Sequence, residues 1–116
     1  MNGTPNEAEP AYHLFLDADE IPVTAGALRL LISDEAHESQ IRALARAVLG
    51  GLQGAPGQSG VLTLPLSAEQ MKITHASLRL LLNDLQREQA DEREIVRRVL
   101  DKLPDEHAIR AIRLDS

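Results

Sequence analysis

The sequence contains no cysteine and no tryptophan, and Tyr12 and Phe15 are its only aromatic residues. The absence of cysteine excludes disulfides, thiol nucleophiles and zinc sites built on thiolates. With so few aromatic rings, the chain lacks the stacking platforms that bind single-stranded nucleic acid. A hydrophobic core must therefore consist of Leu, Ile, Val and Ala, which suits packed helices better than an aromatic-rich β-sandwich.

Long hydrophobic runs and excess positive charge are also missing. No apolar run approaches the length of a membrane span, and the polar N-terminus has no secretory core. Acidic residues outnumber basic residues by 18 to 12, which gives a net charge of −6. A surface of this sign repels phosphate backbones and anionic lipid headgroups. We therefore expect a cytoplasmic protein that contacts no membrane and for which nucleic acid is an unfavoured partner.

The clearest positive signal is internal self-similarity. Residues 12–40 align with residues 62–90, and after a one-residue insertion residues 41–53 align with residues 92–104. The longest identical run is Leu28-Arg29-Leu30-Leu31, which matches Leu78-Arg79-Leu80-Leu81. The similarity exceeds what a leucine-rich composition gives by chance, so it predicts two copies of a βαα unit.

Each copy has the hydrophobic pattern of one strand followed by two helices. The alternating segments Tyr12–Leu16 and Val61–Pro65 are typical of strands. The apolar stripes of the first helices are Ile21, Ala25, Leu28, Leu31 and Ile32 in copy one, and Met71, His75, Leu78, Leu81, Leu82 and Leu85 in copy two. Those of the second helices are Ile41, Leu44, Ala45, Val48, Leu49 and Leu52, then Ile95, Val96, Val99, Leu100 and Leu103. Stripes of this width face a core.

Three pairs of residues have the spacing of helix N-terminal caps. They are Asp17 with Glu20, Ser67 with Gln70, and Asp91 with Glu94. Such pairs satisfy the backbone N–H groups that a helix start leaves without partners. Pro22 predicts that the first helix starts irregularly or slightly later than its cap signal.

Together these patterns predict a mainly helical α+β fold. It is a tandem duplicated βαα unit with a pseudo-two-fold axis, whose four main helices pack on one face of a small antiparallel strand pair. Residues 1–10 are predicted to be a disordered tail and residues 11–116 a single domain. Within that domain, copy one spans 12–53, a Gly-rich linker 50–60, copy two 61–104 and a C-terminal extension 105–116. Pro104 could open a last helix there, although Ala108–Leu114 alternates well enough for a strand. The glycines of the linker are predicted to end the preceding helix.

One segment resembles a catalytic motif. Asp34–Glu38 reads DEAHE and resembles the metal-binding segment of DEAH-type helicases, which implies Mg²⁺ beside bound ATP. The G-x-x-x-x-G-K-[ST] loop that such motors need is missing from the sequence. We therefore interpret the segment as a helix terminus. A metal site that includes His37 is the less favoured alternative, because zinc needs at least three ligands and no other histidine has a suitable spacing.

Other polar residues have a structural and a chemical interpretation. Asp17, Asp19 and Glu20 could act as paired acid and base, but acidic residues at a predicted helix start are adequately explained by capping. His75 lies on an apolar stripe, which indicates a hydrogen-bonded core or interface histidine rather than a pH sensor or catalyst.

Two arginine pairs are the candidate partner-binding residues. Arg42 and Arg46, and their counterparts Arg93 and Arg97, have i,i+4 spacing on the polar sides of the second helices. They could contact an acidic partner or phosphates, while neighbouring glutamates favour surface salt bridges.

The sequence identifies no catalytic residue, cofactor or metal ligand, so we expect no enzyme. The favoured function is a non-catalytic protein-interaction or self-association module, either a homo-oligomer (a dimer) or bound to a protein partner. The alternatives are a regulatory nucleic-acid or transcription-complex binding protein that uses the arginine pairs, and a small metal-dependent hydrolase that uses Asp34, His37 and nearby carboxylates. Nothing in the sequence favours or disfavours a small-molecule sensor with a ligand between the helices.

Overall fold

The computed structural model describes residues 12–34, 36–53, 61–104 and 106–112. The predicted N-terminal tail and most of the predicted Gly-rich linker lie outside these residues. The elements in chain order are β1 (Tyr12–Leu16), α2 (Glu20–Ser33), α3 (Ser39–Gln53), β2 (Leu62–Leu66), α4 (Ala68–Asp84), the short 3₁₀ turn η1 (Arg87–Gln89), α5 (Ala90–Asp101) and α6 (Glu106–Ala111). The fold is mainly helical with one small sheet, as predicted from the hydrophobic patterns.

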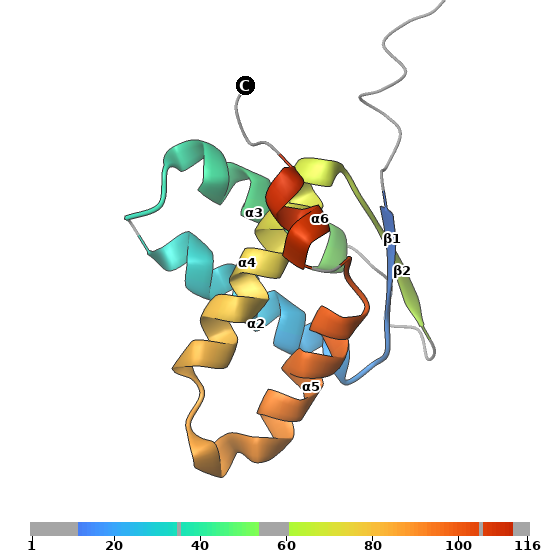
Figure 1. Cartoon of the computed structure of the whole chain (residues 1–116), viewed down its shortest axis with the longest axis vertical. Coiled ribbons are helices and arrows are strands. Elements are labelled where there is room, and N and C mark those ends of the chain that lie inside the picture. The colour runs from blue at the N-terminus through green and yellow to red at the C-terminus, as the bar shows by residue number, and fades with distance from the viewer. Residues whose placement is uncertain (1–11, 35, 54–60, 105, 113–116) are drawn as a thin grey trace, which may run out of the picture.

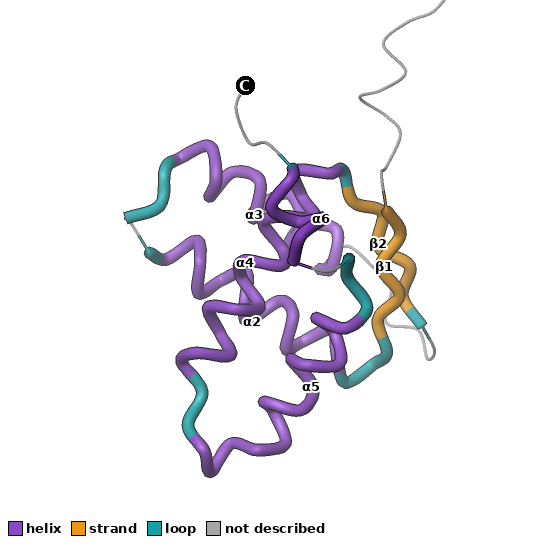
Figure 2. Tube along the Cα trace, viewed as in Figure 1, coloured by secondary structure: helices purple, strands orange, loops and turns teal. Residues whose placement is uncertain are grey.

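The two strands pair antiparallel, which confirms that part of the predicted fold. Leu14 faces Leu64 at the centre of the register, and the outer pairs are Tyr12 with Leu66 and Leu16 with Leu62. The second strand begins and ends one residue later than predicted. In Figures 1 and 2 the strand pair lies at the right-hand side and the helices lie to its left. One face of the sheet is therefore covered and the other faces away from the helices.

Strand periodicity separates these two faces of the sheet. Leu14, Leu16, Leu64 and Leu66 are buried against the helices, while the residues between them on each strand are exposed. This alternation follows from the opposite orientation of successive side chains in a strand. The sheet thus contributes four leucines to the core.

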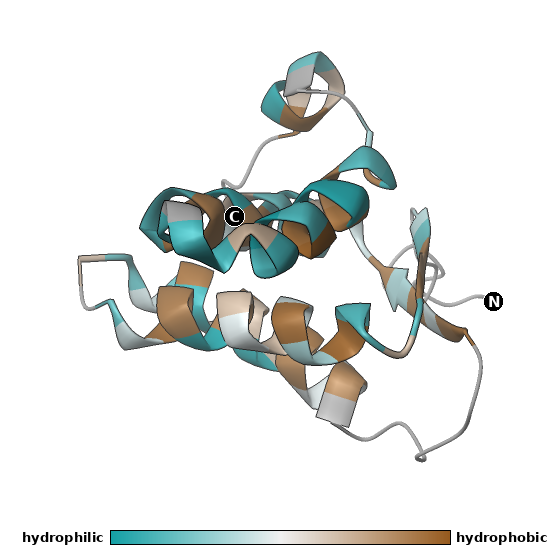
Figure 3. Cartoon of the chain, turned by 90° about the horizontal axis from the view of Figure 1, so that it is seen from below, coloured by the Kyte–Doolittle hydropathy of each residue, from teal (hydrophilic) through white to brown (hydrophobic). Residues whose placement is uncertain are grey.

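The longer helices α2, α3, α4 and α5 form two layers whose hydrophobic surfaces face one another (Figure 3). The predicted stripe residues Leu28, Leu31 and Leu78 are almost fully buried, and Leu81 is half-buried against the same core. From the second helices, Ala45, Val48, Val96 and Val99 complete the same core. The stripes therefore close over one hydrophobic interior that contains no aromatic side chain among the described buried residues.

The N-terminal caps follow the sequence prediction only in part. Ser67 and Gln70 form a complete capping box at α4, with reciprocal side-chain to backbone bonds of 3.1 and 3.0 Å. At α2 only half of the box exists: Glu20 accepts from the Asp17 backbone N–H, and no side chain caps the helix. The prediction for Pro22 is confirmed: α2 begins at Glu20, later than the cap signal at Asp17, whereas α4 begins directly after the equivalent Ser67. The proline lies in the first turn of α2, where a missing N–H costs little.

Two boundary predictions were wrong. Asp91 does not precede α5 as a cap; it lies within the first turn, because η1 joins directly to the helix and Gln89 occupies the cap position. The glycines did not end α3, which continues through Gly50 and Gly51 to Gln53. Close packing explains why α3 continues through the glycines. Gly51 lies so near the Leu64 side chain that a Cβ at residue 51 would approach it to 3.1 Å.

The described part of the C-terminal extension, residues 106–112, contains the helix α6 and no strand; the rest of the extension lies outside the described residues. Ile109 of α6 is buried in the core, and the Lys72 ammonium of α4 donates to the Ile112 carbonyl at 2.5 Å. The apolar contact and the hydrogen bond hold the segment against α4. None of the described helices is both long enough and apolar enough to cross a membrane.

Candidate functional site

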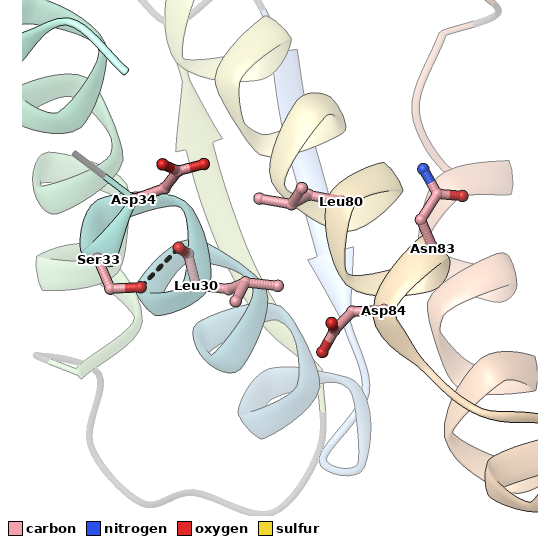
Figure 4. A pocket seen from close by; sticks show the side chains of 6 residues that line it. All are labelled: Leu30, Ser33, Asp34, Leu80, Asn83 and Asp84. Carbon is pink, nitrogen blue, oxygen red and sulfur yellow. Dashed lines mark hydrogen bonds between the residues drawn. The ribbon is translucent and has the colours of Figure 1, made fainter. Parts of the chain in front are cut away.

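An open pocket lies between the C-terminal ends of α2 and α4. Its volume is about 320 Å³, and its lining residues are Leu30, Ser33, Asp34, Leu80, Asn83 and Asp84. Leu30 and Leu80 point into the space between the two helices (Figure 4). In this view the carboxylates of Asp34 and Asp84 lie on opposite sides of the leucine pair. We call this the twin-aspartate pocket.

The α2 side of the pocket is locally ordered by short-range contacts. Asp34 caps the end of α2, as the interpretation of the DEAHE segment as a helix terminus predicted. One oxygen of its carboxylate accepts from the Ala36 backbone N–H at 3.0 Å, and the other lies 3.5 Å from Nε2 of His37. The Ser33 hydroxyl donates to the Leu30 carbonyl at 2.9 Å, which leaves the hydroxyl oxygen available as an acceptor.

The α4 side of the pocket has a different arrangement. Among the described residues Asp84 makes no hydrogen bond or ion pair, and it ends a helix that has no basic residue in its last turn. A helix C-terminus carries partial negative charge, so an aspartate there adds like charge to like. Arg93 of α5 offsets part of this charge, because it donates to the carbonyls of Leu82 and Leu85 at 3.2 and 3.1 Å.

A second polar cluster lies where β1 joins α2. Glu20 is only 1% exposed, and its Oε1 accepts from the Asp17 backbone N–H at 2.8 Å and from the Lys102 ammonium at 2.5 Å. Its Oε2 lies 3.6 Å from Nε of Arg98, close enough for an ion pair but too far for a direct hydrogen bond. The Lys102 ammonium also donates to the Phe15 carbonyl at 2.8 Å. The Lys102 backbone carbonyl accepts a hydrogen bond from the Tyr12 hydroxyl. One buried carboxylate thus ties α5 to β1 and α2.

Asp17, Asp19 and Glu20 are brought together, as their spacing suggested. Oxygen atoms from the three carboxylates lie within 4.8 Å of one another, which would suit a metal ion by distance alone. Arg98 already binds Asp19 at 2.6 Å, however, and Lys102 neutralises Glu20. The hydrogen bond with Asp19 is the main factor that raises the pKa of Arg98 above its ordinary value, so this cation stays charged at every physiological pH. The cluster is an internal ion network with its own cations.

Sequence reasoning missed Arg98 and Lys102 as the partners of this cluster, because the contacts join residues about 80 positions apart in the chain. A signal was nevertheless present in the alignment of the two copies. The acidic pair Asp17 and Glu20 matches the uncharged Ser67 and Gln70, and the basic pair Arg98 and Lys102 matches the uncharged Ala47 and Gly51. These two differences in charge between the copies, which are among several along the alignment, lie at residues that contact each other.

The candidate arginines have separate environments. Arg93 is bound to the end of α4, Arg42 is half-buried, and Arg46 and Arg97 are exposed on α3 and α5 respectively. None of the four makes a salt bridge within the part of the chain that the structure describes. The surface salt bridges that neighbouring glutamates favoured are thus not formed there. His75 is half-buried on α4.

The outer face of the sheet carries Phe15 and Val61, the large hydrophobic residues that are exposed among the described residues. Phe15 is 53% exposed. Val61 directly precedes β2, two positions before the outward-facing Thr63, and is 57% exposed. His13, Thr63 and Pro65 share this face. We call these five residues the outer sheet face.

The two edges of the sheet are less open than its outer face. Pro65 has no N–H, so its pair with His13 must be one without backbone hydrogen bonds. Such pairs alternate with hydrogen-bonded pairs along an antiparallel ladder, so the pair of Phe15 and Thr63 is of the same kind. The backbone groups of Phe15 and Thr63 therefore point to the free edges. On the β1 edge, Lys102 occupies the Phe15 carbonyl. On the β2 edge, Pro65 offers no donor. Both edges therefore resist the addition of a further strand.

No protein-family model matches the chain, and no curated protein or solved structure matches it either.

Proposed function

We propose that the protein is a non-catalytic interaction module that pairs with a second copy of itself through the outer sheet face. The observation that carries the proposal is the position of Phe15. It is the only phenylalanine of the chain, and it is more than half exposed on a sheet whose opposite face fills the core. A large aromatic side chain contributes strongly to binding when a partner covers it.

The charge distribution favours a second copy as the partner. Two molecules of net charge −6 repel each other over most of their surfaces. The outer sheet face contains no carboxylate, so two copies can approach there at the least electrostatic cost. A two-fold contact would place each Phe15 against the same face of the other copy, which is the usual geometry of a homodimer. Because both strand edges resist the addition of a further strand, we expect the sheets to stack face to face.

The predicted duplication forms part of the proposal. A pseudo-two-fold axis through the Leu14 and Leu64 pair would exchange the two strands, and the register of the sheet is consistent with it. The twin-aspartate pocket supports the same idea, since Leu30 and Leu80 occupy equivalent positions, as do Asp34 and Asp84. The two aligned segments would then be two copies of one βαα unit that bury their stripes against each other.

The metal-dependent hydrolase is less well supported. Asp34 and His37 are neighbours, but within the described residues the only three acidic or histidine groups close enough for a metal are Asp17, Asp19 and Glu20. Their carboxylates are paired with Arg98 and Lys102 instead.

Sedimentation velocity of the full chain over a wide range of concentrations tests the proposal. The face is small, so we expect a weak dimer, with a dissociation constant on the order of 10 to 100 µM. Phe15→Ser should shift the equilibrium to monomer by at least about tenfold, because it removes the largest apolar group of the contact. Circular dichroism should show unchanged helix content, since Phe15 is more than half exposed and lies on the face of the sheet opposite the core.

The matched controls are Arg46→Glu and Arg97→Glu, which alter exposed residues on α3 and α5. They should leave the dimer unchanged. A wild-type chain that is monomeric at every concentration would refute self-association. A dimer that is lost in the arginine variants and kept in Phe15→Ser would place the interaction surface on the second helices instead.

A further inference from the structure

We propose that the twin-aspartate pocket binds a linear alkyl diamine, a ligand with an ammonium group at each end of a short methylene chain. The combination of walls and charges points to this chemistry. Leu30 and Leu80 supply an apolar middle, and Asp34 and Asp84 supply an anion on each side of it (Figure 4). A volume of about 320 Å³ is sufficient for a small molecule of this class.

The two helix ends carry more negative charge than the neighbouring cationic side chains neutralise. The C-terminal ends of α2 and α4 line the pocket, and neither helix has a basic residue in its last turn. Among the described contacts at these helix ends, the titratable or charged groups are His37, at 3.5 Å from Asp34, and Arg93, which donates to the carbonyls at the end of α4. Asp84 has no partner among the described residues. A ligand cation would therefore meet one carboxylate that is free and one that is only partly engaged.

Other cations fit these walls less well. A divalent metal needs several close ligands, and in the described ranges three such groups come together only at Asp17, Asp19 and Glu20, away from this pocket. A simple monoamine would neutralise one aspartate and leave the other. A diamine neutralises both while its methylenes cover Leu30 and Leu80, which are half-buried in the free protein. The Ser33 oxygen can accept a further hydrogen bond from one ammonium group.

Isothermal titration calorimetry of the full chain with diamines from trimethylene to hexamethylene tests this proposal. We expect one chain length to bind best, with a dissociation constant below about 1 mM. Butylamine, which has the apolar chain but one charge, and Mg²⁺, which has two charges but no chain, should each bind at least about tenfold more weakly. A lysine-rich peptide serves as a further arm, since the same ammonium chemistry could come from a protein.

The variants Asp34→Asn and Asp84→Asn keep the shape of the side chain and remove its charge. Each should weaken diamine binding by roughly tenfold, because one charge-assisted contact is lost. Asp101→Asn is the matched control: Asp101 is also an exposed aspartate at the C-terminal end of a helix, but it does not line the pocket. It should bind as the wild type does.

Methyl chemical shifts of the wild-type chain give a measurement that needs no variant. The diamine should move the signals of Leu30 and Leu80 and leave those of the strand leucines in place. Equal binding of diamine and butylamine, equal effects of the three asparagine variants, or binding of the peptide alone would each overturn the proposal. The dimer is not involved, so the Phe15→Ser chain should bind the diamine unchanged.

Discussion

The buried carboxylate of Glu20 allows a sharp test of the ion network. In Glu20→Gln the amide oxygen can still accept from the Asp17 N–H, so the local turn is kept. The Lys102 contact changes from an ion pair to a hydrogen bond between an ammonium group and a neutral amide oxygen, which costs about 1 kcal/mol, at the low end of the usual range because Lys102 is 32% exposed. The amide nitrogen then takes the place of Oε2 and presents a donor to Arg98, which is also a donor. With about 1 kcal/mol for that buried unsatisfied group, we expect the free energy of unfolding to fall by about 2 kcal/mol.

The second copy supplies the matched control. Gln70 occupies the position equivalent to Glu20, where it closes the capping box with Ser67 and, among the described residues, forms no hydrogen bond with a cation. Gln70→Glu should keep the capping box and change the free energy of unfolding by less than about 0.5 kcal/mol, since an acidic residue is tolerated at a helix start. Glu20→Gln and Gln70→Glu exchange the same two side chains in opposite directions. A difference in size between their effects on the free energy of unfolding therefore reports the ion network rather than the residue type.

Urea unfolding followed by circular dichroism at the helical band measures both variants, because the chain lacks tryptophan. A loss of 2 kcal/mol corresponds to roughly 8 °C in Tm for a chain of this length. Adding Lys102→Met completes a double-mutant cycle, in which we expect a coupling of about 1 kcal/mol between the two side chains. Equal effects of Glu20→Gln and Gln70→Glu, or additive effects of Glu20→Gln and Lys102→Met, would refute this explanation of the buried glutamate.

Two further predictions concern the core and the caps. Leu31→Ala should lower the free energy of unfolding by about 3 kcal/mol, because Leu31 is 1% exposed, whereas Leu81→Ala at the equivalent half-buried position should cost about half as much. Chemical denaturation compares them, and equal losses would contradict the difference in burial. Ser67→Ala should cost about 1 kcal/mol through loss of the capping box at α4, while Ser33→Ala, which removes only a bond within an exposed helix end, should cost less than about 0.5 kcal/mol. Thermal melts measure this pair, and a Ser67→Ala chain as stable as Ser33→Ala would show that the cap contributes nothing.

The elements with long hydrophobic periodicity were predictable from the sequence. The stripes around Leu28 and Leu78 gave the first helices and their buried faces, and the alternating segments gave the strands to within one residue. Boundaries were less accurate where two local signals competed. Asp91 looked like a cap, yet the chain forms a 3₁₀ turn just before it, and Gly50 looked like a stop, yet the helix continues because Gly51 packs closely on Leu64.

The candidate sites were much harder to predict. Asp34 was placed correctly at a helix end, but the pocket exists only because α2 and α4 bring their ends together. Arg93 was selected for partner binding by its i,i+4 spacing, and the structure assigns it to the carbonyls of Leu82 and Leu85. Spacing along one helix cannot show which neighbouring helix end lies within reach of a long side chain.

The sequence by itself determined which residues are apolar and with what period, and this decides which face of each helix and strand becomes buried, because burial of apolar surface is the dominant favourable term in folding. Only the tertiary structure decided the polar contacts, such as Lys102 with Glu20. Those contacts depend on distances of a few ångström between elements that are far apart in the chain. Hydrogen bonds and ion pairs weaken steeply with small changes in geometry, whereas hydrophobic burial is non-directional and tolerates them.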